Sequence, residues 1–436
     1  MESMKASVIF PATAAQVEPS TPPNASEVSS SRDNASGMTS SGLDPAGLAA
    51  LAVQIRAWAS ELGFGDVGIT DTDLSHAEAG LQKWLDDGCH GDMDYMAAHG
   101  MKRARPAELV PGTVRVISAR MNYLPSDVDP ARWREREMAR SAMPSEAVVS
   151  VYARGRDYHK VMRNRLQQLS DRITQAIGPF GYRVFTDSAP VLEVELAQKA
   201  GLGWRGKHTL LLSREAGSLF FLGEIFVDVP LPTDSENAAR SGSIAPSGTP
   251  DDDQRNAQGS PLMDRGEHCG QCRRCLDVCP TGAITEPFRV DARLCVSYLT
   301  IEHKGAIPET LRAKMGNRIY GCDDCQLYCP WNKFAQPSPL TDFAPRNRLD
   351  SASLVELFAW SETDFMTRLE GSPIRRIGHE RWLRNLAVGL GNALRETTQA
   401  EARTPLRDAL LARRDHPSAL VREHVEWALA QEGVKV

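Results

Sequence analysis

Cysteines are concentrated in one short part of the sequence. The chain of 436 residues contains nine, and eight of them lie between positions 269 and 329. The first four have the spacing C-x2-C-x2-C-x3-C-P of bacterial ferredoxins, in which three thiolates hold one 4Fe–4S cluster and the fourth holds another. The last three repeat the end of this pattern, and one cysteine stands before them. The spacing predicts cluster 1 on Cys269, Cys272, Cys275 and Cys329 and cluster 2 on Cys279, Cys295, Cys322 and Cys325.

Two other uses of these cysteines fit the pattern less well. Zinc would need four ligands with wider separation between cysteine pairs, and it gives no reason for a spacing that occurs nearly twice and ends in proline. Disulfide bonds require an oxidising compartment. We expect no export signal, because Pro11 interrupts a short apolar stretch and no Arg-Arg pair lies near the start. Cys89 stands alone, and we interpret it as a small buried hydrophobic residue.

The composition excludes two classes of protein. Hydrophobic residues make up 42% and charged residues 24% of the chain, and no run of about 18 apolar residues occurs, so no segment is expected to span a membrane. There are 50 Lys and Arg against 56 Asp and Glu, a net charge of -6. A polyanion would therefore have to bind a local basic surface, because the chain as a whole is not positive. We expect a cytoplasmic protein.

The sequence divides into five segments. Polar, low-complexity composition predicts a disordered tail over 1–46 and a linker or surface insertion over 231–266. Between them, 47–230 mixes helical and strand patterns, as a layered α/β domain does. The cysteine-rich segment covers 267–340, and 341–436 shows only helical patterns.

The periodicity of apolar residues places the main elements. Helices are predicted over 48–62, 157–177, 377–393, 405–413 and 418–430. Strands are predicted at 67–69, 114–117, 148–152 and 182–185. The runs 208–212 and 219–229 are separated by a glycine-containing turn, which predicts an antiparallel hairpin between them. The three C-terminal helices indicate a small bundle or helical repeats.

Several long stretches of the chain resemble the epoxyqueuosine reductase family of tRNA-modifying enzymes. The resemblance runs from about residue 48 to the C-terminus. It is carried by VYARGRDYHKVMRNRL (151–166), FTDSAPVLEVELAQKAGLGWRGKHTLLL (185–212), SLFFLGEIFVDVPL (218–231), the two cysteine runs and RRIGHERWLRNLAVGLGNAL (375–394). The polar tail and the insertion at 233–266 depart from the family pattern.

The resemblance implies an α+β protein of three parts. These are a cobalamin-binding α/β module similar to that of reductive dehalogenases, a ferredoxin-like domain with two 4Fe–4S clusters, and a C-terminal HEAT-like helical domain that binds tRNA. It further implies reduction of epoxyqueuosine to queuosine in the tRNA anticodon loop, with electrons from an external donor. The D-x-H-x-x-G signature of histidine-ligated cobalamin is absent, since its nearest approach, from Asp157, has Met162 in place of glycine. The family resemblance therefore implies cobalamin bound without that histidine.

Asp187 is the first candidate for catalysis. It follows a predicted strand and precedes a helix, a usual position for site residues in α/β folds. Opening an epoxide requires protons, which a carboxylic acid can supply if burial raises its pKa. From the residues alone, an N-cap for the next helix is the simpler interpretation; the resemblance favours a proton donor. His159 is a second candidate for substrate orientation or proton transfer, although a histidine in the first turn of a helix is often structural.

The candidate cofactor contacts come from five places in the sequence. The turn before residue 210 lies between glycines that let the backbone approach a ligand closely. By match to the family we add residues elsewhere in the α/β segment. The full set of cobalamin contacts is Arg103, Ser150, Asp187, Lys207, His208, Thr209 and Leu222. Tyr152, Arg154 and Tyr158 offer stacking faces and a guanidinium to a nucleotide.

Arginines recur in the C-terminal helices. We expect Arg375, Arg376, Arg381, Arg384, Arg413 and Arg414 to position tRNA through its phosphates, although a charged helix face is more often only solvated. Two other functions stay open from the sequence. One is a reductive dehalogenase of small organohalides, and the other is an iron–sulfur protein that only carries electrons to a partner enzyme.

Overall fold

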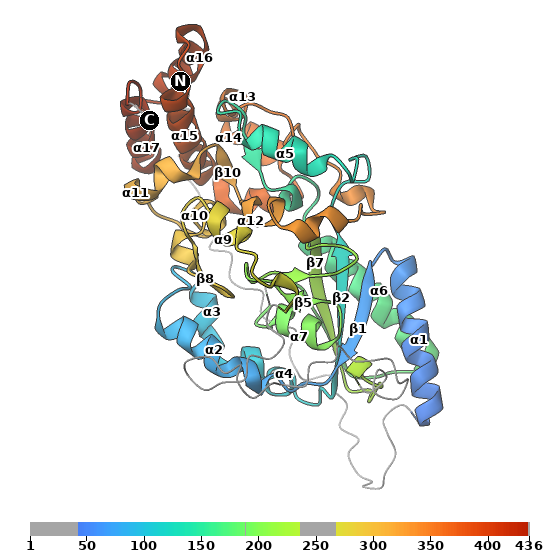
Figure 1. Cartoon of the computed structure of the whole chain (residues 1–436). Coiled ribbons are helices and arrows are strands. Elements are labelled where there is room, and N and C mark those ends of the chain that lie inside the picture. Colours follow the sequence, from blue (N-terminus) through green and yellow to red (C-terminus); the bar gives the residue numbers. More distant parts are fainter. Residues whose placement is uncertain (1–41, 188, 236–266, 435–436) are drawn as a thin grey trace, which may run out of the picture. The chain divides into compact units, whose positions relative to one another are not determined.

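A four-stranded antiparallel sheet organises the first half of the chain in the computed structural model (Figure 1). The strand order is β1-β2-β7-β4. The strands are β1 (Asp66–Thr70), β2 (Arg115–Asn122), β7 (Phe220–Val227) and β4 (Tyr182–Phe185). The structure describes residues 42–187, 189–235 and 267–434, all within one compact unit. The predicted tail over 1–46 and insertion over 231–266 therefore lie mostly outside the described residues.

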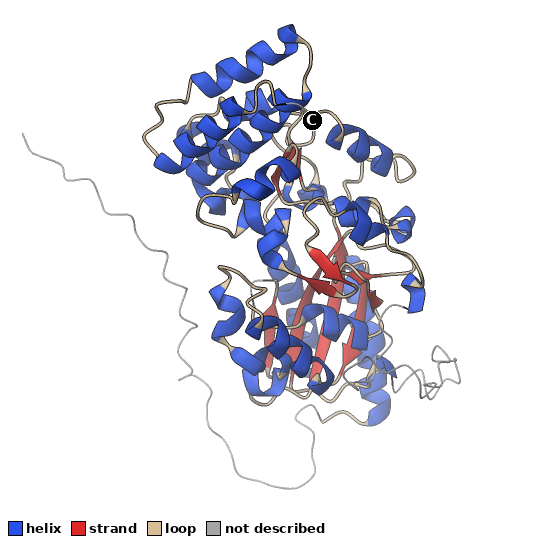
Figure 2. Cartoon of the chain, turned by 60° about the vertical axis from the view of Figure 1, so that its left-hand side comes forward, coloured by secondary structure: helices blue, strands red, loops and turns tan. Residues whose placement is uncertain are grey.

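Helices cover both faces of this sheet (Figure 2). Side chains alternate between the two faces along each strand. On β7, Phe221, Ile225 and Val227 join the core beneath α1 (Pro45–Glu61) and α6 (Tyr158–Ile177). Phe226 faces the other way, toward α2 (Ser75–Asp86) and α7 (Glu193–Lys199). Each helix buries one apolar stripe, as on α1, where Leu48, Leu51, Ala52, Ile55 and Ala59 are buried.

Local sequence signals explain where the two long helices begin. The Asp44 side chain accepts a hydrogen bond from Gly47 N–H, and Pro45 occupies the first helical position of α1. Asp157 caps α6 by accepting from His159 N–H, and Gly178, at φ 82°, ends the helix. Both predicted helices are confirmed to within a few residues at each end.

The predicted hairpin between 208–212 and 219–229 is wrong. Strand β6 (Leu211–Leu212) pairs instead with β5 (Trp204–Arg205), and β7 pairs with β2 and β4 in the large sheet. Only an isolated bridge from Ser213 to Gly217 remains of the expected pairing. The reason is that β7 is apolar on both faces, and a central position in a covered sheet buries both.

The cysteine-rich segment consists of short elements joined by turns. Its helices are α9 (Arg274–Val278), α10 (Val296–Ile301), α11 (Glu309–Arg312) and α12 (Asp324–Leu327). Its strands β8 (Ile284–Glu286) and β9 (Arg289–Val290) pair with each other, while β10 (Arg318–Tyr320) pairs in parallel with β3 (Val148–Val149). The last pairing ties this segment to the α/β segment.

The C-terminal segment is helical, as predicted. It contains α13 (Leu354–Phe358), α14 (Glu362–Arg368), α15 (Gly378–Glu396), α16 (Ala400–Leu411) and α17 (Ala419–Ala430). Helix α15 is buried along most of its length between α17, α13 and β10. In the part of the chain that the structure describes, no helix is long and apolar enough to cross a membrane.

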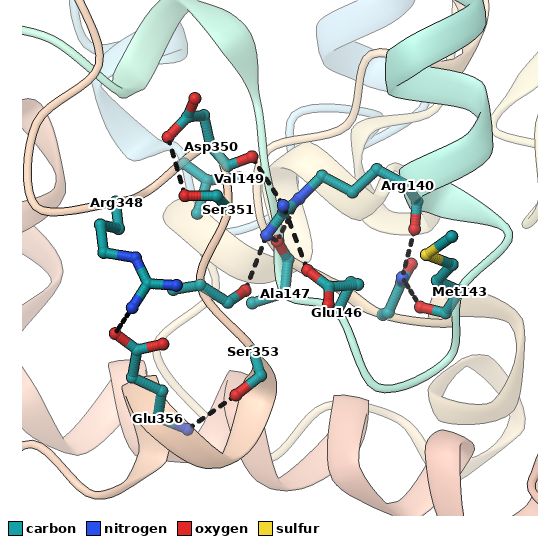
Figure 3. Close-up of polar contacts among 12 residues, drawn as sticks. Arg140, Met143, Glu146, Ala147, Val149, Arg348, Asp350, Ser351, Ser353 and Glu356 are labelled. Atoms are coloured by element: carbon teal, nitrogen blue, oxygen red, sulfur yellow. Dashed lines mark hydrogen bonds and ion pairs between the residues drawn. The ribbon is translucent and has the colours of Figure 1, made fainter.

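Hydrogen bonds from Arg140 connect the α/β segment to the start of the C-terminal segment (Figure 3). It lies on α5 (Trp133–Ser141) and donates hydrogen bonds to the carbonyl oxygens of Ala147, Asp350 and Ala352 at 2.6–3.0 Å. Glu146 lies 3.2 Å from the same guanidinium. One arginine thus satisfies carbonyls from chain segments about 200 residues apart, which orders the loop before α13. Two further short helices in the described part of the chain are α3 (Asp94–Ala98) and α4 (Pro106–Leu109).

Candidate active site

Two cavities divide the eight clustered cysteines between them. The Cys269 cavity is lined by Cys269, Cys272, Cys275 and Cys329. The Asp187 cavity, of about 390 Å³, is lined by Cys279, Cys295, Cys322 and Cys325 together with Asp187 and aromatic side chains. Each cavity thus collects the four thiols that the sequence spacing assigns to one cluster.

The structure distributes the predicted cofactor contacts unevenly. Ser150, Asp187, His208, Thr209 and Leu222 line the Asp187 cavity. Lys207 lines the Cys269 cavity and donates hydrogen bonds to the carbonyl oxygens of Gly270 and Cys272. Arg103 lines neither cavity, because its buried guanidinium donates to the carbonyl oxygens of Tyr95 and Met96. Five of the seven predicted residues can therefore contact a ligand in the Asp187 cavity directly.

Asp187 stands at the end of β4 in a left-handed backbone conformation, with φ 42°. Such a φ is costly for a residue with a side chain and is often found at functional sites. Its carboxylate accepts hydrogen bonds from the Tyr158 hydroxyl and from His159 Nε2, the latter at 3.1 Å. On the other side of the ring, His159 Nδ1 lies 2.8 Å from the Asp157 carboxylate. Asp157, His159 and Asp187 thus form a continuous chain of hydrogen bonds.

This chain separates the pKa values of the two central groups. Burial raises the pKa of Asp187, but the hydrogen bonds from His159 and Tyr158 and the charge of Arg376 outweigh it, so the pKa lies below its usual range. Burial lowers the pKa of His159, whereas its bonds to Asp157 and Asp187 raise it further, to about 9. At neutral pH Asp187 is ionised and His159 carries the proton. The pKa of Asp187 is thus lowered, whereas the sequence-based prediction of a proton donor required a raised pKa.

Tyr158 is fixed by stacking. Its ring lies parallel to Phe221, with centroids 4.1 Å apart and an interplanar angle of 1°, and it also stacks on His159 at 4.1 Å. Burial and the Asp187 charge raise the pKa of Tyr158 well above its usual value. The hydroxyl therefore keeps its proton and serves as a donor to Asp187. The sequence predicted Tyr158 only as a stacking face for a nucleotide.

Two glutamates behind Asp187 were missed by the sequence argument. Glu193 Oε1, at the start of α7, accepts a hydrogen bond from the backbone N–H of Asp187 at 2.6 Å. Glu224 on β7 is fully buried and interacts with Glu193, and neither of its oxygens has another hydrogen-bond donor among the described residues. Burial and the neighbouring negative charges raise the pKa of Glu193 to about 8 and that of Glu224 well above its usual value.

The pKa values of Glu193 and Glu224 are raised because two carboxyl groups in contact and away from water cannot both ionise. At least one of them therefore holds a proton at neutral pH. A sequence signal for Glu224 did exist, because it is the one charged residue in the otherwise apolar strand FFLGEIFV. A lone acidic residue in a strand that is buried on both faces needs a partner, and this one finds it on α7.

The residues around both cavities fit iron–sulfur clusters. His208 is buried, and burial lowers its pKa to about 4, so the ring is neutral. Its Nδ1 accepts from Leu210 N–H, which leaves the proton on Nε2, and that atom has no hydrogen-bond partner among the described residues. Trp204 Nε1, in contact with the Cys329 side of the Cys269 cavity, is likewise without a described partner. Such N–H groups are typical donors to cluster sulfur atoms.

The Asp187 cavity also suits a large cofactor with an apolar plane and a polar rim. Tyr152, Phe220, Phe221 and Leu222 supply apolar surface, and Ser150, Thr209 and Gln326 supply hydrogen-bonding groups. Thr209 has φ 73°, so the turn from β5 to β6 brings its backbone close to the cavity. Mostly apolar walls with a few polar groups are usual for cofactor sites.

The C-terminal arginines are less available than the sequence predicted. Arg384 is a correction: it is fully buried and donates to the carbonyl oxygens of Leu299, His303 and Gly305, each at 2.7 Å. Arg413 donates to Phe358 and Trp360 carbonyls, and Arg381 to Ile301. Helix α15 is central in its segment, so an arginine on it points into protein. Arg375 and Arg414 remain exposed.

Arg376 lies between the C-terminal segment and the site. It pairs with Glu302 at 2.6 Å, and its charge lowers the pKa of Asp187. The same charge acts to lower the pKa values of Tyr152 and Tyr320. Sequence spacing predicted Arg376 as a phosphate contact, and its half-exposed side chain at this position leaves room for one.

Two family models match parts of this chain. The family described as "4Fe-4S double cluster binding domain" matches residues 268–332. The family described as "Epoxyqueuosine reductase QueG, DUF1730" matches residues 103–188, which include Asp157, Tyr158, His159 and Asp187. The first match confirms the prediction of two 4Fe–4S clusters.

Curated relatives cover most of the chain. The epoxyqueuosine reductase of Burkholderia pseudomallei (strain K96243) is 64% identical over 401 residues, which is 89% of this chain and 93% of the relative. The epoxyqueuosine reductase of Escherichia coli (strain K12) is 53% identical over 390 residues, or 89% of this chain and 91% of the relative.

Solved structures share the fold. A crystal structure of epoxyqueuosine reductase with a tRNA-Tyr epoxyqueuosine-modified tRNA stem loop superposes with a TM-score of 0.66 at 23% identity, covering 89% of this chain and all of that chain. A selenomethionine-labelled epoxyqueuosine reductase gives the same TM-score over 88% of this chain and 99% of that one. The predicted α+β architecture, with a double-cluster domain and C-terminal helices, is confirmed.

Proposed function

Because this chain belongs to the epoxyqueuosine reductase family, we propose that it reduces epoxyqueuosine to queuosine in tRNA. The reaction takes up two electrons and two protons, breaks both carbon–oxygen bonds of the epoxide, forms a carbon–carbon double bond and releases water. Electrons, which the clusters carry one at a time, and protons must therefore both reach the site where the epoxide reacts. The observation that carries the proposal is the Asp187 cavity, where four thiols for cluster 2 and the Asp157–His159–Asp187 chain line or adjoin the same space.

Within this proposal, the chain's own residues supply the protons. His159 holds a proton at neutral pH, and its Nε2 lies 3.1 Å from the Asp187 carboxylate. We assign Asp187 the role of the group that passes this proton to the departing oxygen, with His159 as its source. Asp157 keeps the ring oriented and favours its charged form. The Tyr158 hydroxyl and Glu193 fix the two ends of Asp187, its carboxylate and its backbone N–H.

The proposed cofactors of the site are cobalamin and the two clusters. Cobalamin would supply a reduced cobalt centre that acts on the epoxide, and the clusters would supply it with electrons one at a time. Ser150, Thr209, His208 and Leu222 would hold cobalamin in the Asp187 cavity. Arg103 and Lys207 would act at a distance, by ordering the backbone at Tyr95 and Cys272.

The proposed macromolecular substrate is tRNA that carries epoxyqueuosine. The relatives act on this nucleoside by name, and one structural neighbour is a complex with a modified tRNA stem loop. Among the six arginines predicted to contact tRNA, Arg375, Arg376 and Arg414 have exposed side chains that could contact phosphate. A tRNA substrate supports a cytoplasmic location. The donor of electrons is external to the chain.

Metal content and turnover test the proposal together. The protein is purified anaerobically, supplied with cobalamin, and analysed for iron and cobalt. We expect about eight iron atoms and about one cobalt atom per chain, with conversion of epoxyqueuosine tRNA to queuosine tRNA measured by nucleoside mass spectrometry under a chemical reductant. Asp187→Asn should retain both metals and lose turnover. About eight iron atoms without cobalt or turnover would instead favour a protein that only carries electrons.

A further inference from the structure

Positive side chains surround the Cys269 cavity. Among the residues that the structure describes, Lys207, Arg214, Arg274 and Lys333 line it, and no Asp or Glu does. Within the segments 207–215, 268–277 and 328–336, five Lys and Arg stand against two Asp and Glu. The whole chain has the opposite balance, with 50 against 56. The positive surface is thus local to this cavity, as it would be for a negatively charged ligand or partner.

Three of the four cations are exposed, and we call Arg214, Arg274 and Lys333 the basic rim. Arg274 has no ion-pair partner among the described residues. Arg214 lies 5.8 Å from the Trp331 ring centroid, and Lys333 lies 4.7 Å from that of Phe334. Cation–π contacts position a charge without neutralising it. The basic rim therefore keeps its charge available to a partner.

Lys207, the fourth cation, binds the loop backbone inside the cavity. Its ammonium donates to the carbonyl oxygens of Gly270 and Cys272 at 2.6 and 3.0 Å, inside the loop that carries the first cluster 1 cysteines. Its charge thus offsets the negative charge of cluster 1 from within. By contrast, none of the three rim cations donates a side-chain hydrogen bond to the backbone of that loop within the described residues, and Arg214 contacts the His268 ring there, at 3.4 Å.

Apolar surface lies within the basic rim. Phe334 is 37% exposed, and Trp331 is half-buried beside it and donates from Nε1 to the His268 carbonyl oxygen at 3.2 Å. Aromatic side chains inside a ring of charge are the usual composition of a protein docking site, in which the charges guide encounter and the apolar centre excludes water. A bare inorganic anion would need no such centre.

We propose that the basic rim is the docking surface for an acidic, one-electron carrier protein that reduces cluster 1. This inference rests on the proposed function, because it identifies the kind of electron donor that the reaction requires. In each encounter the reduced carrier loses one electron and cluster 1 gains it. Two encounters provide the two electrons of one turnover, and the two protons come from solvent through the site described above.

Charge reversal on the basic rim tests the proposal. The double variant Arg274→Glu/Lys333→Glu is compared with Arg163→Glu, an exposed arginine on α6. The probe is a purified acidic ferredoxin of the plant type. Its binding to the cluster-loaded enzyme is measured by calorimetry at two ionic strengths. We expect the double variant to bind about tenfold more weakly or worse, and to lose most of the salt dependence. Arg163→Glu should bind as the unchanged protein does.

Reduction kinetics separate this proposal from the proposed function. At equal iron content, the ratio of the ferredoxin-supported rate to the rate with dithionite and methyl viologen should fall in the double variant relative to the unchanged protein, for both cluster reduction and turnover. Equal ferredoxin binding by all variants would overturn the docking surface while leaving the reductase intact. An increased KM for tRNA under the chemical reductant would also overturn it, because the rim would then bind RNA. No turnover by any variant with any donor would instead refute the proposed function.

Discussion

The backbone N–H of Asp187 donates a hydrogen bond to the Glu193 carboxyl across the turn between β4 and α7, at 2.6 Å. This contact holds a residue whose φ of 42° is unfavourable on its own. Behind Glu193 stands Glu224, fully buried on β7. A carboxyl pair between α7 and β7 thus helps to determine where the proposed proton-transfer residue lies.

Glu193 is therefore predicted to be a positioning residue. Glu193→Gln keeps an oxygen that can accept from Asp187 N–H, whereas Glu193→Ala removes it. We expect the alanine variant to lose about 100-fold in single-turnover rate, the cost of a misplaced reacting group, and the glutamine variant to recover most of that loss. Amide exchange at Asp187 should quicken in the alanine variant only. Equal rates in both variants would contradict the role.

The activity should depend on the protonation of His159. Its pKa is raised to about 9, whereas that of Asp187 is lowered. The rate should therefore be flat through neutral pH and fall as the pH rises through about 9. His159→Gln should be slow and should lose this alkaline limb. The measurement is the single-turnover rate between pH 6 and 10.

The same group links stability to pH. A histidine whose folded pKa exceeds its unfolded value of about 6.5 stabilises the fold fully below that value. This contribution disappears as the pH rises through about 9. The urea midpoint of the unchanged protein should therefore fall over this interval by more than that of His159→Gln. Parallel curves would show that the His159 bonds to Asp157 and Asp187 do not persist in solution.

Arg384 should support stability and not tRNA binding. Arg384 is buried, its bond to the Leu299 carbonyl oxygen is buried, and its bonds to His303 and Gly305 are partly buried, so Arg384→Ala removes three donors, at a cost of about 3 kcal/mol. Arg414→Ala, at an exposed position, should change the free energy of unfolding by less than about 0.5 kcal/mol. Urea unfolding at equal iron content measures the difference. A folded Arg384→Ala protein with normal stability but weaker tRNA binding would restore the prediction made from the sequence.

Sequence spacing succeeded where chemistry is local. The ferredoxin pattern fixes which thiols come together, and the structure brings the two sets to two cavities. It failed where tertiary context decides. The pairing of β7 with β2 and β4 follows from burial on both faces, which an alternating pattern does not reveal. The sequence pattern predicts Arg384 as a surface charge on a helix, but α13 and α17 enclose α15, so the side chain is buried. The low pKa of Asp187 depends on hydrogen bonds from His159 and Tyr158, to which the charge of Arg376, about 190 residues away along the chain, adds.

The division of thiols between the two cavities predicts separable cluster losses. Cys272→Ser removes a ligand in the Cys269 cavity, and Cys325→Ser removes one in the Asp187 cavity. Each variant should fall from about eight to about four iron atoms per chain if its damaged site loses the whole cluster. The two should differ in what remains: Cys325→Ser loses the cluster beside Asp187 and should have no turnover with any reductant. Cys272→Ser keeps that cluster, so a small chemical reductant should still support slow turnover. Complete inactivity of Cys272→Ser with four iron atoms and bound cobalt would show that electrons cannot enter at the Asp187 cavity without cluster 1.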